Sequence, residues 1–202
     1  MIKYTAIKNK SIASALLALF IIPLIGAIIM YNTGIAIPTK KTNHGALINP
    51  PLNFQFLIPS LKQNPSDNSL KVLEHKWLLL YVNPKACETL CLNTLYKIRQ
   101  THIALDKDSS RLIRVLLTST PLSNEQERKI DTQYPGTYSY FIPSLIVQRF
   151  FALSPFNQDL LKQGRLYIVD PLGNVILTYP LTTSFESLLS DLKRLLQLSH
   201  IG

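Results

Sequence analysis

The stretch Lys76-Trp77-Leu-Leu-Leu-Tyr-Val-Asn-Pro-Lys-Ala-Cys87-Glu-Thr-Leu-Cys91 decides the fold and contains both cysteines of the 202-residue chain. Its first half, Trp77–Val82, is a continuous run of apolar residues, which is typical of a strand buried on both faces. Asn83-Pro84 then breaks the run. The sequence therefore predicts that the cysteine pair lies where a central strand turns into a helix.

A helix is predicted from Glu88 to about Leu105, because apolar residues recur there with helical spacing. The recurring positions are four, three, four and three residues apart: Cys91, Leu95, Ile98, His102 and Leu105. This stripe predicts that Cys91 faces the core of the domain. Asp106–Ser110 reads as a turn that ends the helix.

Cys87 and Cys91 are four residues apart, about 6 Å of helical rise, so both sulfur atoms are expected on one side of the helix. Cys87 is expected at or just before the first turn, where free N–H groups and the helix dipole favour a thiolate. Lys85 would assist this effect and Glu88 would oppose it. Such a pair can close a disulfide, exchange with a partner's disulfide or hold a thiophilic metal.

Further strands are predicted on both sides of this region. A second buried strand is expected over residues 111–118 and a third over 165–169. A tight turn over 171–174 is expected to join the third strand to a hairpin partner over 175–179. Nearer the N-terminus, an edge strand or hairpin is expected around Leu52–Leu61.

Two more helices are predicted by capping pairs, the first at Ser123 with Gln126 and the second at Thr183 with Glu186. The aromatic stretch between residues 134 and 156 has no clear assignment. The order is strand, helix, strand, helix, hairpin and helix. It predicts an α/β fold, namely a thioredoxin-like domain with a central mixed sheet flanked by helices.

An uncharged apolar run from Ile12 to Met30 precedes this domain. As a helix it would be roughly 28 Å long, close to the hydrocarbon thickness of a bilayer. Pro23 and Gly26 interrupt it, but helices in lipid tolerate both. We expect an uncleaved transmembrane anchor here; a cleavable signal peptide is the alternative, although the run is long for one and no A-x-A site follows.

Charge predicts the orientation of the anchor. Lys3, Lys8 and Lys10 precede the run, and no acidic residue occurs before Asp67. By the positive-inside rule, the anchor is expected to cross the bacterial inner membrane once, with the N-terminus in the cytoplasm and the C-terminal domain in the periplasm.

Four segments are therefore expected. They are a cytoplasmic N-terminus over residues 1–11, a transmembrane anchor over 12–31, a tether over 32–50 and a thioredoxin-like domain over 51–202.

The composition excludes several classes of protein. The formal charge of +9 falls to +3 once the six lysines that precede the first acidic residue, Asp67, are set aside. No basic stripe with interleaved aromatic residues remains, so we expect no nucleic-acid partner. Two cysteines are too few for a disulfide-stapled scaffold, a zinc ribbon or an iron–sulfur site.

The cysteine stretch resembles the signature stretch of the SCO/SenC family, and the hairpin Leu166-Tyr-Ile-Val-Asp170-Pro171-Leu-Gly173 with its final helix matches that family's layout. The resemblance spans roughly residues 50–198 in order, and the anchor and the proline-rich lead-in also match the family's layout. Thr42-Asn-His-Gly45 with Pro50-Pro51 is similar, more closely, to divergent SCO-like transmembrane proteins of proteobacteria that accompany oxidase genes.

The resemblance implies a membrane-anchored thioredoxin fold and a role in assembling the copper centre of cytochrome c oxidase. The implied partner is an oxidase subunit or another assembly factor. Cys87 and Cys91 would then be the redox pair, or two ligands of copper. Cys87 would attack or coordinate, and Cys91 would resolve or co-ligate.

The chain departs from the family at two places. Leu92 stands where the family has proline after the second cysteine. Lys162, Gln163 and Gly164 stand where the family's third copper ligand, a histidine, is expected. Two thiolates alone can bind Cu(I) linearly but handle Cu(II) poorly, which favours thiol chemistry over copper delivery.

None of the four histidines is an obvious substitute. His102 lies eleven residues after Cys91, about 16 Å along the helix, and is expected to be a hydrogen-bonded boundary residue. His75 is expected to be exposed at the opposite end of the first strand, and His200 lies in the tail. His44 lies on the expected tether, from which it could approach the cysteines or a partner.

Three functions remain open from the sequence. The first is an SCO-like assembly factor that uses thiol–disulfide exchange or Cu(I) binding at the cysteine pair. The second is a general periplasmic thiol–disulfide oxidoreductase. The third is a non-catalytic scaffold in which Cys87 and Cys91 form a structural disulfide.

Overall fold

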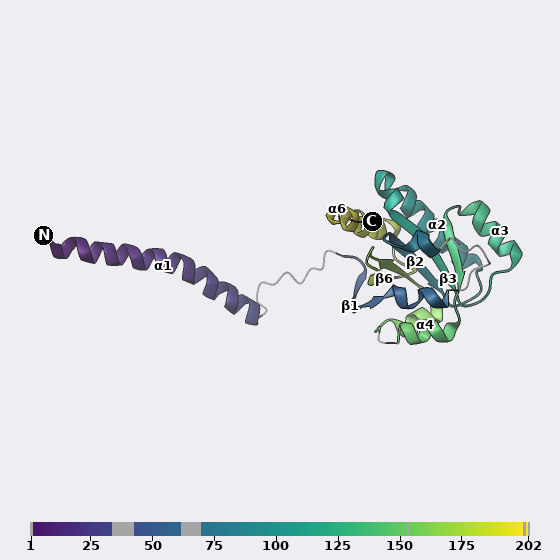
Figure 1. Ribbon diagram of the computed structural model, residues 1–202, viewed down its shortest axis with the longest axis horizontal. Coiled ribbons are helices and arrows are strands. Elements are labelled where there is room, and N and C mark those ends of the chain that lie inside the picture. The colour runs from purple at the N-terminus through teal and green to yellow at the C-terminus, as the bar shows by residue number, and fades with distance from the viewer. Residues whose placement is uncertain (1, 34–42, 62–69, 153, 200, 202) are drawn as a thin grey trace. The chain divides into compact units, whose positions relative to one another are not determined.

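The computed structural model describes residues 2–33, 43–61, 70–152, 154–199 and 201. The chain divides into two compact units, residues 1–42 and 43–202, which are described separately. In the first unit, helix α1 covers Ile2–Thr33 (Figure 1). Its segment Ile12–Thr33 is long and apolar enough to cross a membrane. The apolar N-terminal helix expected from the sequence is therefore present.

The second unit is built on a six-stranded sheet in the order β1-β6-β5-β2-β3-β4. The strands are β1 Ala46–Asn53, β2 Trp77–Asn83, β3 Leu112–Thr118, β4 Thr137–Phe141, β5 Arg165–Val169 and β6 Asn174–Pro180. Strands β2, β3 and β4 run parallel, whereas β5 and β6 form the antiparallel hairpin. Every residue of β2 is buried, as a central strand covered on both faces requires.

Helices cover both faces of this sheet (Figure 1). On one face, α2 (Thr89–Ile103), α3 (Asn124–Gln133) and α6 (Phe185–Leu198) share an apolar core with residues of β2, β3, β5 and β6. On the other face lie α4 (Ser144–Phe150) and α5 (Asn157–Gln163). The predicted α/β layout with a mixed central sheet is confirmed.

Two capping predictions have different outcomes. The Ser123 and Gln126 capping box is present at the start of α3. At α6 the cap lies one residue later than predicted, because the Ser184 side chain accepts a hydrogen bond from the Ser187 N–H. Ser184 has the extended backbone conformation that a capping residue needs.

The region before β2 differs from the expected strand or hairpin over 52–61. Strand β1 begins earlier, at Ala46, and is followed by single 3₁₀ turns at Phe54–Phe56 and Ile58–Ser60. β1 is an edge strand that pairs only with β6 among the described strands, so it accommodates Pro50 and Pro51 at a register shift. Residues 46–50, predicted to be the end of the tether, are part of the sheet.

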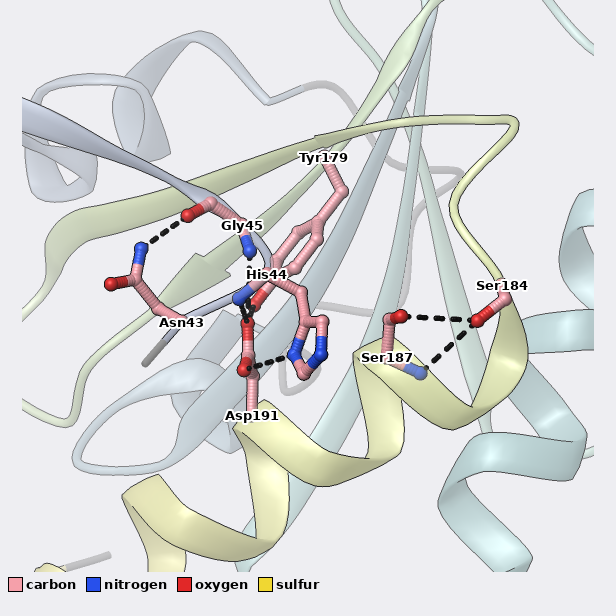
Figure 2. A network of polar contacts seen from close by, with 7 residues as sticks. All are labelled: Asn43, His44, Gly45, Tyr179, Ser184, Ser187 and Asp191. Atoms are coloured by element: carbon pink, nitrogen blue, oxygen red, sulfur yellow. Dashed lines mark hydrogen bonds and ion pairs between the residues drawn. The ribbon is translucent and has the colours of Figure 1, made fainter. Parts of the chain in front are cut away.

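At the start of the second unit, the chain before β1 is hydrogen-bonded to Asp191 of α6 (Figure 2). The backbone N–H groups of His44 and Gly45 donate to Oδ2 of buried Asp191 at 2.8 and 2.9 Å. The Tyr179 hydroxyl donates to the same oxygen at 2.9 Å, and His44 Nδ1 lies 3.0 Å from Oδ1. We call these four residues the Asp191 cluster. It fixes the chain to the domain just before β1.

Glycine is required inside the Asp191 cluster. A Cβ atom on Gly45 would overlap the aromatic ring of Tyr179. Only a residue without a side chain lets the backbone approach α6 closely enough for its N–H group to reach the carboxylate.

Candidate functional site

Cys87 and Cys91 form a disulfide, with their Cα atoms 5.0 Å apart. Cys87 immediately precedes Glu88, the N-cap residue of α2, and Cys91 lies in the first turn of that helix. Both side chains are largely covered, with exposed fractions of 5% for Cys87 and 2% for Cys91. The structure therefore brings the two predicted site residues together at the end of the central strand.

A compact turn delivers the chain from β2 to the disulfide. The Asn83 side chain donates to the Lys85 carbonyl at 2.9 Å, and the Glu88 N–H donates to the Ala86 carbonyl at 3.0 Å. The N-cap residue Glu88 makes no side-chain capping bond. Glu88 therefore does not satisfy the first N–H groups of α2 with its side chain, and the positive end of the helix lies beside Cys87.

Helix α3 holds the disulfide loop from one side. The Gln126 side chain donates to the Cys87 carbonyl at 3.0 Å, while its oxygen accepts the Ser123 N–H at 2.9 Å. Farther along, the Tyr134 hydroxyl donates to the Leu92 carbonyl at 3.1 Å. The capping residue Gln126 thus also positions Cys87, a role that its place in the sequence does not reveal.

Two hollows border the disulfide. One, of ≈ 330 Å³, lies against Cys87 and is lined by α3 residues that include Gln126 and Lys129. The other, of ≈ 420 Å³, lies against Cys91 and includes Tyr81 and Gln163. Each sulfur-bearing residue thus borders a depression in which groups of a partner can be accommodated.

The surroundings of the disulfide do not fit a three-ligand copper site. Among the described residues, no group of three or more His, Cys, Asp and Glu side chains could hold a metal ion. Gln163 lines the hollow beside Cys91 near the position where the resemblance implies a histidine. The neutral amide of Gln163 is a poor ligand for copper, so the reduced cysteines would provide two thiolates without an imidazole.

Gly164 fixes the backbone at this point. Its φ is +82°, and a Cβ atom there would lie 2.6 Å from the Val82 carbonyl oxygen. The residue that follows Gln163 must therefore be glycine for the chain to pass against the end of β2.

The histidines of the second unit lie elsewhere. His44 contacts Asp191 on α6 instead of being free to approach the cysteines, which corrects the tether interpretation. His102 Nε2 lies 3.1 Å from the Leu112 carbonyl oxygen, as expected of a hydrogen-bonded boundary residue. Burial lowers the pKa of His102. His75 is exposed before β2, and His200 lies outside the described residues.

Comparisons with known proteins agree with this fold. A family model described as "Transmembrane-like, thioredoxin-like, C-terminal domain" matches residues 77–199. No curated protein matches the chain.

Among solved structures, yeast Sco1 is 13% identical with a TM-score of 0.50, and the match covers 64% of this chain and 84% of that one. The Arabidopsis thaliana ScoI structure with copper bound is 14% identical with a TM-score of 0.49, over 64% and 89%. A thiol:disulfide interchange protein from Bacteroides sp. is 12% identical with a TM-score of 0.48, over 76% and 90%. At 13% identity the similarity to yeast Sco1 concerns the fold alone.

Proposed function

The chain belongs to the family of transmembrane-like, thioredoxin-like C-terminal domains, and on this premise we propose that it is a membrane-tethered thiol–disulfide exchange factor acting through Cys87 and Cys91. The observation that carries the proposal is the disulfide at the strand-to-helix turn, bordered by a hollow on each side. Cys87 is the attacking residue, because it is the more exposed of the two and lies beside the positive end of α2.

The exchange consists of two balanced steps. The Cys87 thiolate attacks one sulfur of a partner's disulfide, forming a mixed disulfide and releasing the partner's other sulfur as a thiolate. The Cys91 thiolate then attacks the Cys87 sulfur, closes the Cys87–Cys91 disulfide and releases the partner's second thiolate. Two electrons pass to the partner, and a dithiol reductant restores the cysteine pair.

The resemblance to SCO/SenC proteins supports a specific partner. We place the substrate among the cysteines that bind copper in a cytochrome c oxidase subunit, which must be reduced before they accept the metal. The lysines before Ile12 support a cytoplasmic N-terminus and a periplasmic domain. Cu(I) held linearly by the two reduced thiolates is compatible with this site, but no histidine supplies a third ligand there among the described residues.

The burial of the disulfide favours a second candidate. Exposed fractions of 5% and 2% for its two residues are low for an exchanging pair. A scaffold with a structural disulfide would have the same geometry. The two candidates differ in how the native protein reacts with thiols.

The test uses the full chain in detergent. We expect glutathione to reduce the native disulfide, and the Cys91→Ser variant to accumulate a mixed disulfide at Cys87 with a disulfide-bonded peptide from the oxidase copper site. Mass spectrometry identifies the adduct, and Cys87→Ser is the matched control. Cu(I) titration against a competing chelator measures metal binding in parallel. If the disulfide reacted with glutathione only after denaturation, the exchange function would be rejected and the scaffold with a structural disulfide would be favoured.

A further inference from the structure

Tyr81 is a buried polar residue beside the disulfide that the exchange steps above do not use. It lies in β2, its exposed fraction is 0%, and it belongs to the apolar core that also contains Cys87 and Cys91. Together with Cys91 it lines the hollow of ≈ 420 Å³. Tyr81 therefore lies on the same face of the sheet as the disulfide and borders the same hollow as Cys91.

The Tyr81 hydroxyl has no hydrogen-bond partner of normal geometry among the described residues. Thr94 is close enough to lower the pKa of Tyr81, but its own hydroxyl donates to the Leu90 carbonyl at 2.8 Å. Burial outweighs this effect and raises the pKa of Tyr81 to about 12. The phenol thus keeps its proton at neutral pH and has no strong acceptor in the oxidised protein.

Reduction of the disulfide creates an acceptor in the same place. Cys91 and Thr94 are three residues apart on α2, so they share the face of the helix that covers β2. Both are buried there. A sulfur in a disulfide is a weak acceptor, whereas a thiolate is a strong one that forms charge-assisted hydrogen bonds.

We propose that the Tyr81 hydroxyl donates a hydrogen bond to the Cys91 sulfur in the reduced protein, and that Tyr81 is a positioning residue for the resolving cysteine. This inference rests on the proposed exchange function. The bond stabilises the Cys91 thiolate, and hence the reduced form, so it makes the cysteine pair easier to reduce. It also fixes the resolving sulfur during the second exchange step.

The test compares Tyr81→Phe with Tyr167→Phe in the full chain in detergent. Tyr167 is a matched control, because it is equally buried and its hydroxyl also lacks a hydrogen-bond partner of normal geometry. It lies in β5 beside Leu80, but it packs in the core on the opposite face of the sheet. Each substitution removes one oxygen atom and leaves the ring in place.

The first readout is the equilibrium of the cysteine pair with dithiothreitol. We expect Tyr81→Phe to shift it about ten- to a hundredfold toward the disulfide, the size of one hydrogen bond to a charged group. Tyr167→Phe should stay within about twofold of the parent. Equal shifts in both variants, or none in Tyr81→Phe, would overturn the inference.

The second readout does not need exchange activity. In the Cys87→Ser background, Cys91 is the remaining cysteine, and its thiolate is followed by absorbance at 240 nm as the pH rises. Tyr81→Phe is expected to move the midpoint upward, whereas Tyr167→Phe leaves it in place. If this shift occurs while glutathione fails to react with the native protein, the exchange function is refuted and the Tyr81–Cys91 hydrogen bond is supported. If the midpoint does not move, the bond is refuted whatever the exchange assay shows.

Discussion

Replacement of Asp191 by alanine is expected to cause a large loss of stability. The carboxylate accepts hydrogen bonds from two backbone N–H groups and from the Tyr179 hydroxyl, all on one oxygen, and contacts His44 with the other. Asp191 is only 4% exposed, so water has little access to the donors if the carboxylate is removed. A hydrogen bond to a charged group contributes about 1.5–3 kcal/mol, and such bonds on one oxygen do not add fully.

The expected magnitude follows from the donors that are left without a partner. Asp191→Ala leaves three donors in a buried site, which should lower the free energy of unfolding by about 3–5 kcal/mol. That is a large share of the total of about 5–15 kcal/mol for a typical domain. Asp191→Asn keeps one acceptor oxygen but loses the charge, and about 1–2 kcal/mol is expected. Tyr179→Phe removes a single donor and should cost about 1 kcal/mol.

The assay is urea unfolding of the full chain in detergent, followed by fluorescence of Trp77. Trp77 is the only tryptophan and is 5% exposed, so its emission reports unfolding of the second unit. With a slope of about 2 kcal/mol per M urea, Asp191→Ala should lower the midpoint by about 1.5–2.5 M. If Asp191→Ala and Tyr179→Phe lowered it equally, the carboxylate would not be the centre of the cluster.

Three further predictions concern the region around the cysteines and the sheet. Burial lowers the pKa of His102 below the 6.5 of the unfolded chain, so the unfolded chain binds more protons between the two values. Stability should therefore fall as the pH drops through this window, and His102→Gln should flatten that part of a urea-midpoint profile between pH 7.5 and 5. Gly164→Ala should destabilise the domain by more than about 2 kcal/mol in thermal unfolding, because of its positive φ and the nearby Val82 carbonyl. Gly136→Ala is its control, since Gly136 has a similar φ of +77° but its nearest neighbour is an arginine side-chain nitrogen at 3.1 Å instead of a backbone carbonyl at 2.6 Å; equal losses would contradict the steric argument. Gln163→His should confer a cysteine-dependent Cu(II) absorption band that the parent lacks. A folded variant without the band would place this position out of reach of the cysteines.

The central fold could be predicted because its signals are local. The apolar run of β2 and the stripe of α2 carry their periodicity within one segment, and the hairpin turn at Pro171–Gly173 joins two recognisable strands. Strand β4 was missed because an edge strand is only partly covered: four of its five residues are half-buried. Helices α4 and α5 have seven residues each, too few for a helical period to stand out.

The candidate site was predictable only in part, since most of its contacts join distant segments. The cysteine pair was predicted from its place between β2 and α2. Gln126 was recognised as a cap, but the carbonyl that it binds lies 39 residues earlier. His44 and Asp191 are 147 residues apart, and nothing near His44 indicates its partner. In the sequence Tyr81 is one more member of a buried apolar run, because the pattern does not show where its hydroxyl lies or whether it has a hydrogen-bond partner.

The Asp191 cluster also has a mechanical consequence. Any force that reaches the domain from the segment before Asn43 acts first on the carboxylate of α6 and on the ladder between β1 and β6. β2, which precedes the cysteine pair, lies beyond β6 and β5 in the sheet. A load on the N-terminal attachment therefore falls first on α6 and on the β1 edge of the sheet, and only then on β2. The Asp191 cluster is thus the mechanical attachment point of the second unit.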